Sequence, residues 1–304
     1  MTAPESSRLS PLSQAGWDRA AHERAIPDLL ASAKADPTTR VLTVVGDSAP
    51  LAATDELRWI SPSEAPAGGE WAFLGRDAAG AALLATVHAA RGAELFPAPA
   101  GWSGLRTVGG TLSADDAGAF VAALSLGRWL LEAPHCPACG ALTMLVDAGW
   151  SRRCPSCGRQ HFPRTDPAVI VAITSASDPD LLLLGSNALW VANRYSCFAG
   201  FVESGEGLEA AVRREVLEES GIEVDAVKYR GSQAWPYPRS LMVGFHATAV
   251  DDAAARADGE EIAAVRWFTR AEIGDALRGG SEFVLPGSAS IAHRLISDWH
   301  VGAA

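Results

Sequence analysis

The sequence predicts an α/β protein in which a mixed sheet lies between helices, preceded by a four-cysteine segment and a small α+β N-terminal domain. Three observations indicate this. Strand-like and helix-like runs alternate from Ala168 to His300, two C-x-x-C pairs precede them, and short β-type runs followed by one long helix occupy the first part of the chain. The alternation suits an α/β/α sandwich, because each face of the sheet then has helices to bury it.

The first part of the chain holds short elements. Residues 1 to about 40 are polar and alanine-rich, with a weak helix expected over residues 20–34. A longer helix is expected after Ser113, which resembles an N-cap with Asp116 three residues later, and it would run to about Glu132, before Pro134. Glycine, proline and aspartate separate runs that we expect to be strands of a small sheet, at residues 41–45, 57–60, 71–74 and 82–87.

Four cysteines have the spacing C-x2-C-x14-C-x2-C, which is typical of a tetrahedral zinc site. They are Cys136, Cys139, Cys154 and Cys157. Two disulfides are disfavoured because no secretory signal is evident, and a thioredoxin-type dithiol has a single C-x-x-C in a βαβ setting. Four thiolates leave no open coordination position, so we expect one structural Zn²⁺ per chain. The fifth cysteine, Cys197, follows a tyrosine and a serine in a largely apolar run and is expected to be a buried core residue.

The remainder of the chain begins with an expected linker over residues 163–167. A closing helix is expected over residues 289–300, where four apolar residues recur at helical spacing. The expected strands between them are at residues 168–174, 181–185, 227–234, 241–250 and 265–269.

The segment after Gly200 carries the most informative charges. A helix from about Leu208 to Ser220 places Glu215, Glu218 and Glu219 on one face, at positions i, i+3 and i+4. Like charges at this spacing repel, so the arrangement is unfavourable unless something neutralises it. Mg²⁺ is usually shared between carboxylates and substrate phosphates. The pattern therefore predicts metal-assisted phosphate chemistry, and a solvated acidic helix face is the alternative.

These residues resemble the Nudix box, G-x5-E-x7-R-E-U-x-E-E-x-G-U, where U is a bulky aliphatic residue. The match covers every fixed position from Gly200 to Ile222. The resemblance implies a Nudix hydrolase with an α/β/α sandwich and a mixed sheet, and it makes the three glutamates metal ligands. Arg214 is expected to pair with Glu206 and orient the box loop, with a surface arginine as the alternative.

A second motif, Ser232-Gln-Ala-Trp-Pro-Tyr-Pro-Arg-Ser240, follows the box. It resembles SQPWPFPxS, which marks the NADH pyrophosphatase subgroup, although Ala234 replaces a proline and Tyr237 a phenylalanine. Ala234 leaves the loop less rigid. The subgroup's architecture implies an N-terminal domain, a zinc ribbon and a Nudix domain, here at residues 1–133, 134–163 and 164–304.

The resemblance also implies the reaction. A homodimer would hydrolyse the pyrophosphate of NAD(H) to nicotinamide mononucleotide and AMP, and would act on the NAD cap at RNA 5′ ends. Mg²⁺ or Mn²⁺ on the glutamates would cancel pyrophosphate charge, polarise a P–O bond and lower the pKa of a bound water. The general base is Glu219 or Glu261. Free NAD(H) and NAD-capped RNA both remain open as the physiological target.

Further site residues follow from the same resemblance. Glu261, six residues before Trp267, resembles an additional distal carboxylate, with its neighbour Glu260 as the alternative. Phe201 resembles an aromatic residue that stacks on a ring of the dinucleotide, and Phe162 one that is contributed across the dimer. Core packing is the alternative for both. The other expected substrate contacts are Ala199, Gln233 and Ala292.

Composition limits the partners. The net charge of -11 argues against nonspecific nucleic-acid or membrane-surface binding as the main role. Apolar runs such as Ala168–Thr174 are too short to span a bilayer, and no signal peptide is evident. Together with a reduced four-thiolate site, this predicts a soluble cytoplasmic protein.

Two other functions are considered. One is a Nudix hydrolase for another nucleoside diphosphate conjugate such as ADP-ribose, against which the Ser232–Ser240 motif argues. The other is a zinc-ribbon RNA-binding protein with a vestigial hydrolase domain. The intact glutamates and the acidic net charge argue against that function.

Overall fold

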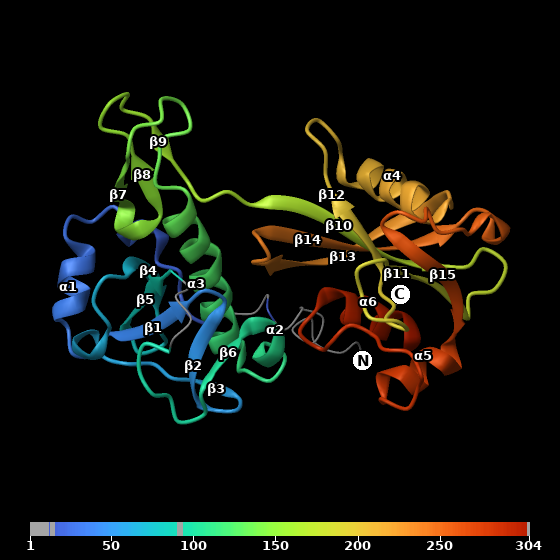
Figure 1. Cartoon of the computed structure of the whole chain (residues 1–304), viewed down its shortest axis with the longest axis horizontal. Coiled ribbons are helices and arrows are strands. Elements are labelled where there is room, and N and C mark those ends of the chain that lie inside the picture. Colours follow the sequence, from blue (N-terminus) through green and yellow to red (C-terminus); the bar gives the residue numbers. More distant parts are fainter. Residues whose placement is uncertain (1–11, 13–15, 90–93, 303–304) are drawn as a thin grey trace. The chain divides into compact units, whose positions relative to one another are not determined.

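The computed structural model of the chain describes residues 12, 16–89 and 94–302 (Figure 1). Its contacts divide the chain into two compact units, which we describe separately. The first unit contains the described residues of Pro11–Thr165 together with Trp235–Arg239. The second unit contains Asp166–Ala234 and the chain from Ser240 onward.

The first unit is built on a six-stranded mixed sheet with the order β3-β2-β1-β5-β4, in which β6 also pairs with β2. The β1–β5 pair is parallel and the other pairs are antiparallel. Helix α3 packs on this sheet, so closely that a Cβ on Gly127 would lie 2.6 Å from Val87. Its elements are α1 (Leu29–Ala35), β1 (Arg40–Val45), β2 (Ser48–Ala53), β3 (Glu56–Leu57), β4 (Glu70–Arg76), β5 (Ala82–His88), β6 (Trp102–Gly104), α2 (Leu105–Val108) and α3 (Ala114–Glu132).

The helix predicted after Ser113 is confirmed as α3. Its predicted N-cap is confirmed too, because the Ser113 hydroxyl accepts a hydrogen bond from the backbone N–H of Asp116. The weak helix expected over residues 20–34 is wrong in its first half. Ala20 and Asp28 have positive φ values of 40° and 57°, which an α-helix excludes, so α1 begins only at Leu29. Strands β2 and β6 were not predicted, and β2 contains a proline at position 50.

The zinc ribbon is a three-stranded sheet in the same unit, with the order β7-β8-β9. Two side chains of the ribbon anchor it to the N-terminal elements. The indole N–H of Trp150 donates to the carbonyl of Phe73 at 2.6 Å, and the buried guanidinium of Arg152 donates to the carbonyl of Leu130 at 2.6 Å. The ribbon strands are β7 (Met144–Val146), β8 (Ser151–Arg153) and β9 (Gln160–His161).

The second unit is organised around β10, the central strand of a six-stranded sheet with the order β13-β14-β10-β11-β15. Strand β14 pairs with β10 in parallel, whereas β12 and β11 share its other edge in antiparallel pairing. The elements are β10 (Asp166–Thr174), β11 (Leu181–Asn187), β12 (Phe198–Phe201), α4 (Leu208–Ser220), β13 (Val224–Trp235), β14 (Ser240–Ala249), β15 (Ile262–Thr269), α5 (Arg270–Leu277) and α6 (Ile291–His300).

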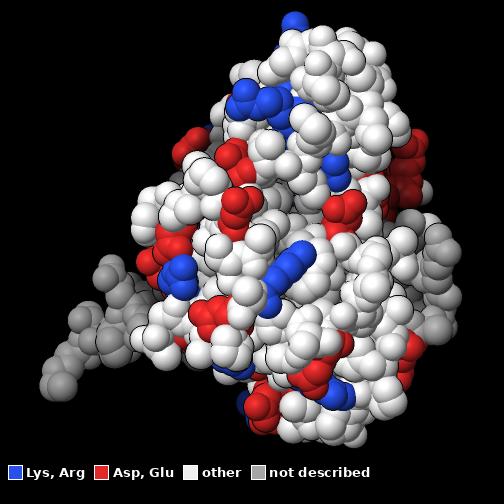
Figure 2. Space-filling view, turned by 90° about the vertical axis from the view of Figure 1, so that its left-hand side faces the viewer, with Lys and Arg blue, Asp and Glu red and all other residues white. Residues whose placement is uncertain are grey.

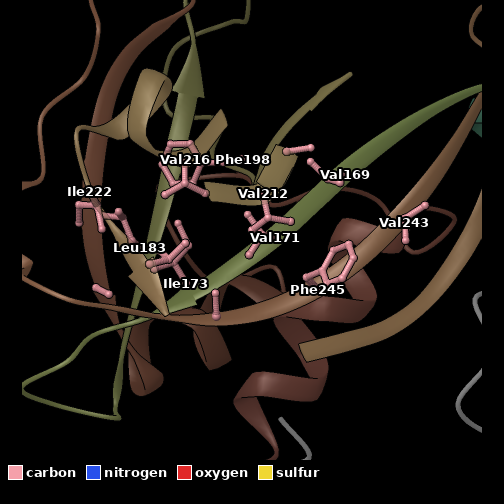
Figure 3. Close-up of a cluster of buried hydrophobic side chains, with 14 of the residues drawn as sticks. Val169, Val171, Ile173, Leu183, Phe198, Val212, Val216, Ile222, Val243 and Phe245 are labelled. Atoms are coloured by element: carbon pink, nitrogen blue, oxygen red, sulfur yellow. The ribbon is translucent and has the colours of Figure 1, made fainter. Parts of the chain in front are cut away.

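The two faces of this sheet carry separate cores, as alternation along β10 requires. Val169, Val171 and Ile173 point to a core that contains Val212 and Val216 of α4 (Figure 3). The intervening residues of β10 belong to a second core with α6, formed by Ile170, Ala172, Ile291, Leu295, Ile296 and Trp299. The mixed sheet is therefore covered by helices on both faces, which confirms the predicted α/β/α sandwich.

Three expectations for this unit need correction. The linker expected over residues 163–167 is shorter, because β10 already begins at Asp166. Strand β12 was not predicted, since it has only four residues and contains Gly200. Helix α5 was also missed, although its capping box of Thr269 and Glu272 is a sequence signal for a helix start.

Two surface properties bear on partners. None of the helices among the described residues is long and apolar enough to cross a membrane. On the face shown in Figure 2, acidic and basic side chains are interspersed among many neutral ones. The net charge of -11 is therefore not gathered into one acidic area on that face.

Candidate functional site

Helix α4 presents Glu215 and Glu219 to the backbone of β12. The helix ends at Gly221, whose φ of 67° is the left-handed conformation that favours glycine at a helix C-terminus. The carboxyl group of Glu215 approaches Gly200 so closely that a Cβ at position 200 would lie 2.0 Å from it. Any other side chain at position 200 would have to displace this carboxylate from its place against the strand.

Glu219 is the most buried of these carboxylates, with 5% of its surface exposed. It accepts a hydrogen bond from the backbone N–H of Ala199, but its Oε2 atom has no donor among the described residues. Burial, followed by the charges of Glu261 and Glu215, raises the pKa of Glu219 to about 8. A buried carboxylate oxygen without a partner, close enough to feel the charges of Glu261 and Glu215, fits a bound cation, because a cation would relieve both penalties.

Glu261 precedes β15 in a turn fixed by hydrogen bonds. Asp258 accepts from the backbone N–H groups of Glu260 and Glu261 at 2.9 and 3.1 Å, and the Glu261 carbonyl accepts from Ala188 at 2.8 Å. The charge of Glu261 raises the pKa of both Glu215 and Glu219, after the larger effect of their burial. This proximity favours Glu261 over the neighbouring Glu260 as the fourth carboxylate.

Arg214 confirms the predicted pairing with Glu206, to which it donates two hydrogen bonds of 2.9 and 2.8 Å. The same guanidinium donates to Glu215 at 2.8 Å, to Glu218 at 3.1 Å and to the carbonyl of Phe201 at 3.0 Å. Arg214 therefore ties the box loop, strand β12 and helix α4 together. One guanidinium cannot neutralise all the carboxylates of the group, and it makes no hydrogen bond to Glu219.

The two aromatic residues are on the surface of their units. Phe201 ends β12 with 53% of its surface exposed, and Phe162 follows β9 with 64% exposed. Core packing is therefore wrong for both. Phe162 belongs to the first unit, whereas the other expected substrate contacts and all four glutamates belong to the second unit.

Gln233 has a side chain that is fully engaged within the protein. With 1% of its surface exposed, it donates to the carbonyl of Ala289 and accepts from the backbone N–H of Ile291, both at 2.7 Å. These bonds fix the start of α6, where Ala292 is also buried. A substrate contact by the Gln233 amide would have to compete with them, a constraint that the motif alone did not reveal.

The four ribbon cysteines converge on one point, with all their sulfur atoms within 4.8 Å of one another. Two of the Sγ–Sγ distances are 3.7 and 3.5 Å. Four sulfurs placed tetrahedrally about 2.3 Å from a zinc ion would be separated by about 3.8 Å, so the thiols fit zinc. All five cysteines are free, and a disulfide would need an S–S distance of about 2.05 Å.

The two cysteine turns have the same backbone design. The N–H of Cys136 donates to the carbonyl of Ala141 and that of Cys154 donates to Arg159, both at 2.8 Å. Backbone N–H groups, first that of Cys157, lower the pKa of Cys154 to about 7, which favours the thiolate. His161 Nε2 lies 3.1 Å from Cys136 Sγ, a contact that the cysteine spacing did not predict.

The Ser232–Ser240 motif places its aromatic residues, Trp235 and Tyr237, in the first unit. Trp235 and Tyr237 meet edge to face with their ring centroids 5.2 Å apart. The guanidinium of Arg106 lies 4.1 Å from the Tyr237 ring, where a cation is attracted to the aromatic face. Arg106 had no sequence signal, because it lies in the four-residue helix α2, far along the chain from the motif.

Comparisons with known proteins agree with the two motifs. The NUDIX domain family matches residues 164–284, and the NADH pyrophosphatase zinc ribbon domain family matches residues 132–162. NAD-capped RNA hydrolase NudC of Mycobacterium tuberculosis is 38% identical over 304 residues, covering 95% of this chain and 94% of the relative. NAD-capped RNA hydrolase NUDT12 of Homo sapiens is 40% identical over 198 residues, covering 62% of this chain and 42% of that relative.

Proposed function

Because the chain belongs to the Nudix hydrolase family, in the group with an NADH pyrophosphatase zinc ribbon, we propose that it hydrolyses NAD(H) to nicotinamide mononucleotide and AMP and removes NAD caps from RNA 5′ ends. The relatives that match most of the chain are named for the second activity. The observation on which the proposal depends is Glu219, a buried carboxylate with an unpartnered oxygen beside Glu215 and Glu261.

We assign Glu215, Glu218, Glu219 and Glu261 as the residues that hold Mg²⁺ or Mn²⁺. When bound, such cations neutralise pyrophosphate charge, polarise a P–O bond and make an adjacent water more acidic. Water attacks one phosphorus in line and the other phosphate leaves. Glu219, whose pKa is raised by burial and then by the charge of Glu261, and Glu261 itself are the candidates to accept the proton of that water.

Other residues position the substrate. Phe201, exposed at the end of β12, would stack on a ring of the dinucleotide and keep the reacting phosphorus within reach. The backbone at Ala199 and Ala292 would contact the substrate beside it. Arg214 holds the loop and Glu215 in place, which maintains the carboxylate arrangement.

The remaining assignments concern the whole chain. We propose a homodimer in which Phe162 is supplied across the interface, one Zn²⁺ per chain on Cys136, Cys139, Cys154 and Cys157, and a cytoplasmic location. Zinc on four cysteines would have a structural role, because no coordination position remains for a substrate. The division into an N-terminal domain, zinc ribbon and Nudix domain at residues 1–133, 134–163 and 164–304 is part of the same proposal.

The test compares NADH, ADP-ribose and a short NAD-capped RNA as substrates, each with Mg²⁺ or Mn²⁺. We expect reduced nicotinamide mononucleotide and AMP from NADH, a free 5′-monophosphate end from the RNA, and a lower kcat/KM for ADP-ribose. A preference for ADP-ribose would support the alternative function, a Nudix hydrolase for another nucleoside diphosphate conjugate. A loss of activity of about 10²-fold or more in Glu219→Gln, with folding retained, distinguishes hydrolysis by this site from hydrolysis by a contaminant.

A further inference from the structure

We propose that a cavity in the first unit binds a nucleotide of single-stranded RNA, namely one that follows the NAD cap. This inference rests on the proposed function. The cavity has a volume of about 650 Å³ and is bounded by the end of α3, the zinc ribbon, and Pro238 and Arg239 of the Ser232–Ser240 motif. Small-molecule sites in proteins have volumes of roughly 300 to 1,000 Å³, so one nucleotide fits.

Two aromatic side chains line the cavity. Trp129 is half-buried on α3, and Phe162 is largely exposed after β9. The Trp129 ring is held by Arg152, whose guanidinium lies 5.5 Å from it and is itself buried. Every nucleobase can stack on an aromatic face, so this pair favours a base without selecting a sequence.

The charge of the lining is opposite to that of the chain. Arg128, Arg164 and Arg239 line the cavity, and Glu132 is the one carboxylate among its lining residues. The whole chain, in contrast, has 36 acidic and 25 basic residues. Arginines of this group also have contacts within the protein, such as Arg128 to Asp47 at 2.6 Å. A guanidinium has five N–H donors in total, so phosphate can be bound in addition.

The position of Phe162 favours a nucleotide of capped RNA over a free small molecule as the ligand of the cavity. This residue is the aromatic side chain that we assign to the dinucleotide, and it also lines the cavity. A ligand in the cavity is therefore next to the expected position of the cap. In capped RNA the following nucleotide is joined to the dinucleotide by a phosphodiester, which supplies both a base for the aromatic rings and a phosphate for the arginines.

The experiment measures binding separately from hydrolysis. Fluorescence anisotropy of an uncapped, 5′-monophosphorylated single-stranded RNA is followed with the full-length zinc-loaded protein and no added Mg²⁺ or Mn²⁺. Arg164→Glu should weaken RNA binding about tenfold, the scale of a lost charged hydrogen bond, and should make the affinity less dependent on salt. Trp129→Leu should weaken binding without changing the salt dependence, because stacking releases no counterions.

Arg159→Glu is the matched control, since Arg159 is an exposed arginine of the nearby zinc ribbon that does not line the cavity. It should bind RNA as the wild type does. Equal losses in Arg164→Glu and Arg159→Glu would overturn the cavity assignment in favour of general charge attraction.

NADH hydrolysis separates the two proposals. The Arg164→Glu variant should keep the wild-type kcat/KM for NADH, and an equal rise of KM for NADH would assign the cavity to the dinucleotide instead of RNA. If the wild type hydrolyses neither NADH nor capped RNA but binds RNA through Arg164, the proposed function fails and the cavity assignment stands. If NADH is hydrolysed and neither Arg164→Glu nor Trp129→Leu weakens RNA binding, the cavity assignment fails and the proposed function stands.

Discussion

Glu218 and Glu219 share one helix face but have different surroundings. Glu219 is buried against Ala199, whereas the side chain of Glu218 is 59% exposed and contacts Arg214. Glu219→Gln and Glu218→Gln should each lower kcat by about 10²-fold or more, because each removes charge from a site that compensates developing phosphate charge. Steady-state kinetics with NADH at saturating Mg²⁺ tests this.

Phe201→Ala is the comparison variant for the glutamates. It should mainly raise KM, because stacking acts equally in the ground state and the transition state. Near-wild-type kcat in both glutamate variants would instead support the solvated acidic helix face. Circular dichroism of all three variants checks that the fold is retained.

The raised pKa of Glu219 also predicts how the stability of the metal-free protein depends on pH. Its folded-state pKa of about 8 exceeds the ordinary value of 4.5, so the folded state holds this proton more tightly than the unfolded state. As pH rises from about 4.5 to about 8, the folded protein therefore loses stability. Glu219→Gln cannot titrate and should be more stable than the wild type at about pH 8, with a smaller difference at about pH 5.

Urea unfolding of the zinc-loaded protein without Mg²⁺ or Mn²⁺ measures this difference. Glu218→Gln serves as the control, because its exposed carboxylate has less to gain from neutralisation. Parallel stability curves for the wild type and Glu219→Gln would contradict the burial argument.

At the residue scale, spacing alone predicted the carboxylates of α4, because a helix fixes which side chains share a face. Spacing did not predict the contacts that depend on distant segments. Gln233 was expected to contact substrate, but its amide is engaged by Ala289 and Ile291, which are brought to it only by tertiary folding. The exposure of Phe162 and Phe201 was equally undetermined by the sequence, since phenylalanine is usually buried.

At the scale of elements, the zinc ribbon is the part of the fold that should depend most on a bound ligand. Its strands have only two or three residues each, too few for an independent core, so metal binding should contribute directly to its folding free energy. Cys136→Ser or Cys154→Ser should lose zinc and lower the Tm. Metal analysis by mass spectrometry and thermal unfolding measure the two effects.

Cys197→Ser is a matched control for the ribbon variants, because Cys197 is buried in the α6 core and is not one of the four clustered thiols. It should retain zinc even if it is less stable. Zinc-free wild-type protein, or ribbon variants that melt like the wild type, would refute the structural role.

Elements with strong periodicity or caps were predicted from the sequence, among them α3, α4, α6 and β10. The elements that were missed are short or depend on neighbours. Strand β2 contains Pro50 and is defined by its three partner strands, and β12 exists because it pairs with β10. Local sequence cannot specify such pairing, because the partner supplies the hydrogen bonds.

At the scale of the whole molecule, the expected substrate contacts are divided between the two units, with Phe162 in the first and the glutamates in the second. If Phe162 serves the partner's site, mixing Glu215→Gln chains with Phe162→Ala chains should restore activity in the heterodimer. One site of that heterodimer has both an intact carboxylate group and an intact aromatic ring.

Differently tagged subunits allow the heterodimer to be purified and its NADH hydrolysis compared with that of each parent. The recovered activity should be at most about half that of the wild type, since only one site per dimer is complete. An active monomer, or a verified heterodimer no more active than its parents, would place both residues in one chain's own site.

The pairing of β10 with β14 has a consequence for how the protein is made. Strand β10 is rich in valine and isoleucine, and its parallel partner begins only at Ser240, after β11, β12, α4 and β13 have been synthesised. During translation, one edge of this apolar strand therefore stays unpaired until β14 has been synthesised. Glu219 likewise meets Glu261 only afterwards, so the proposed carboxylate site forms late in synthesis, after the open strand edge has been exposed.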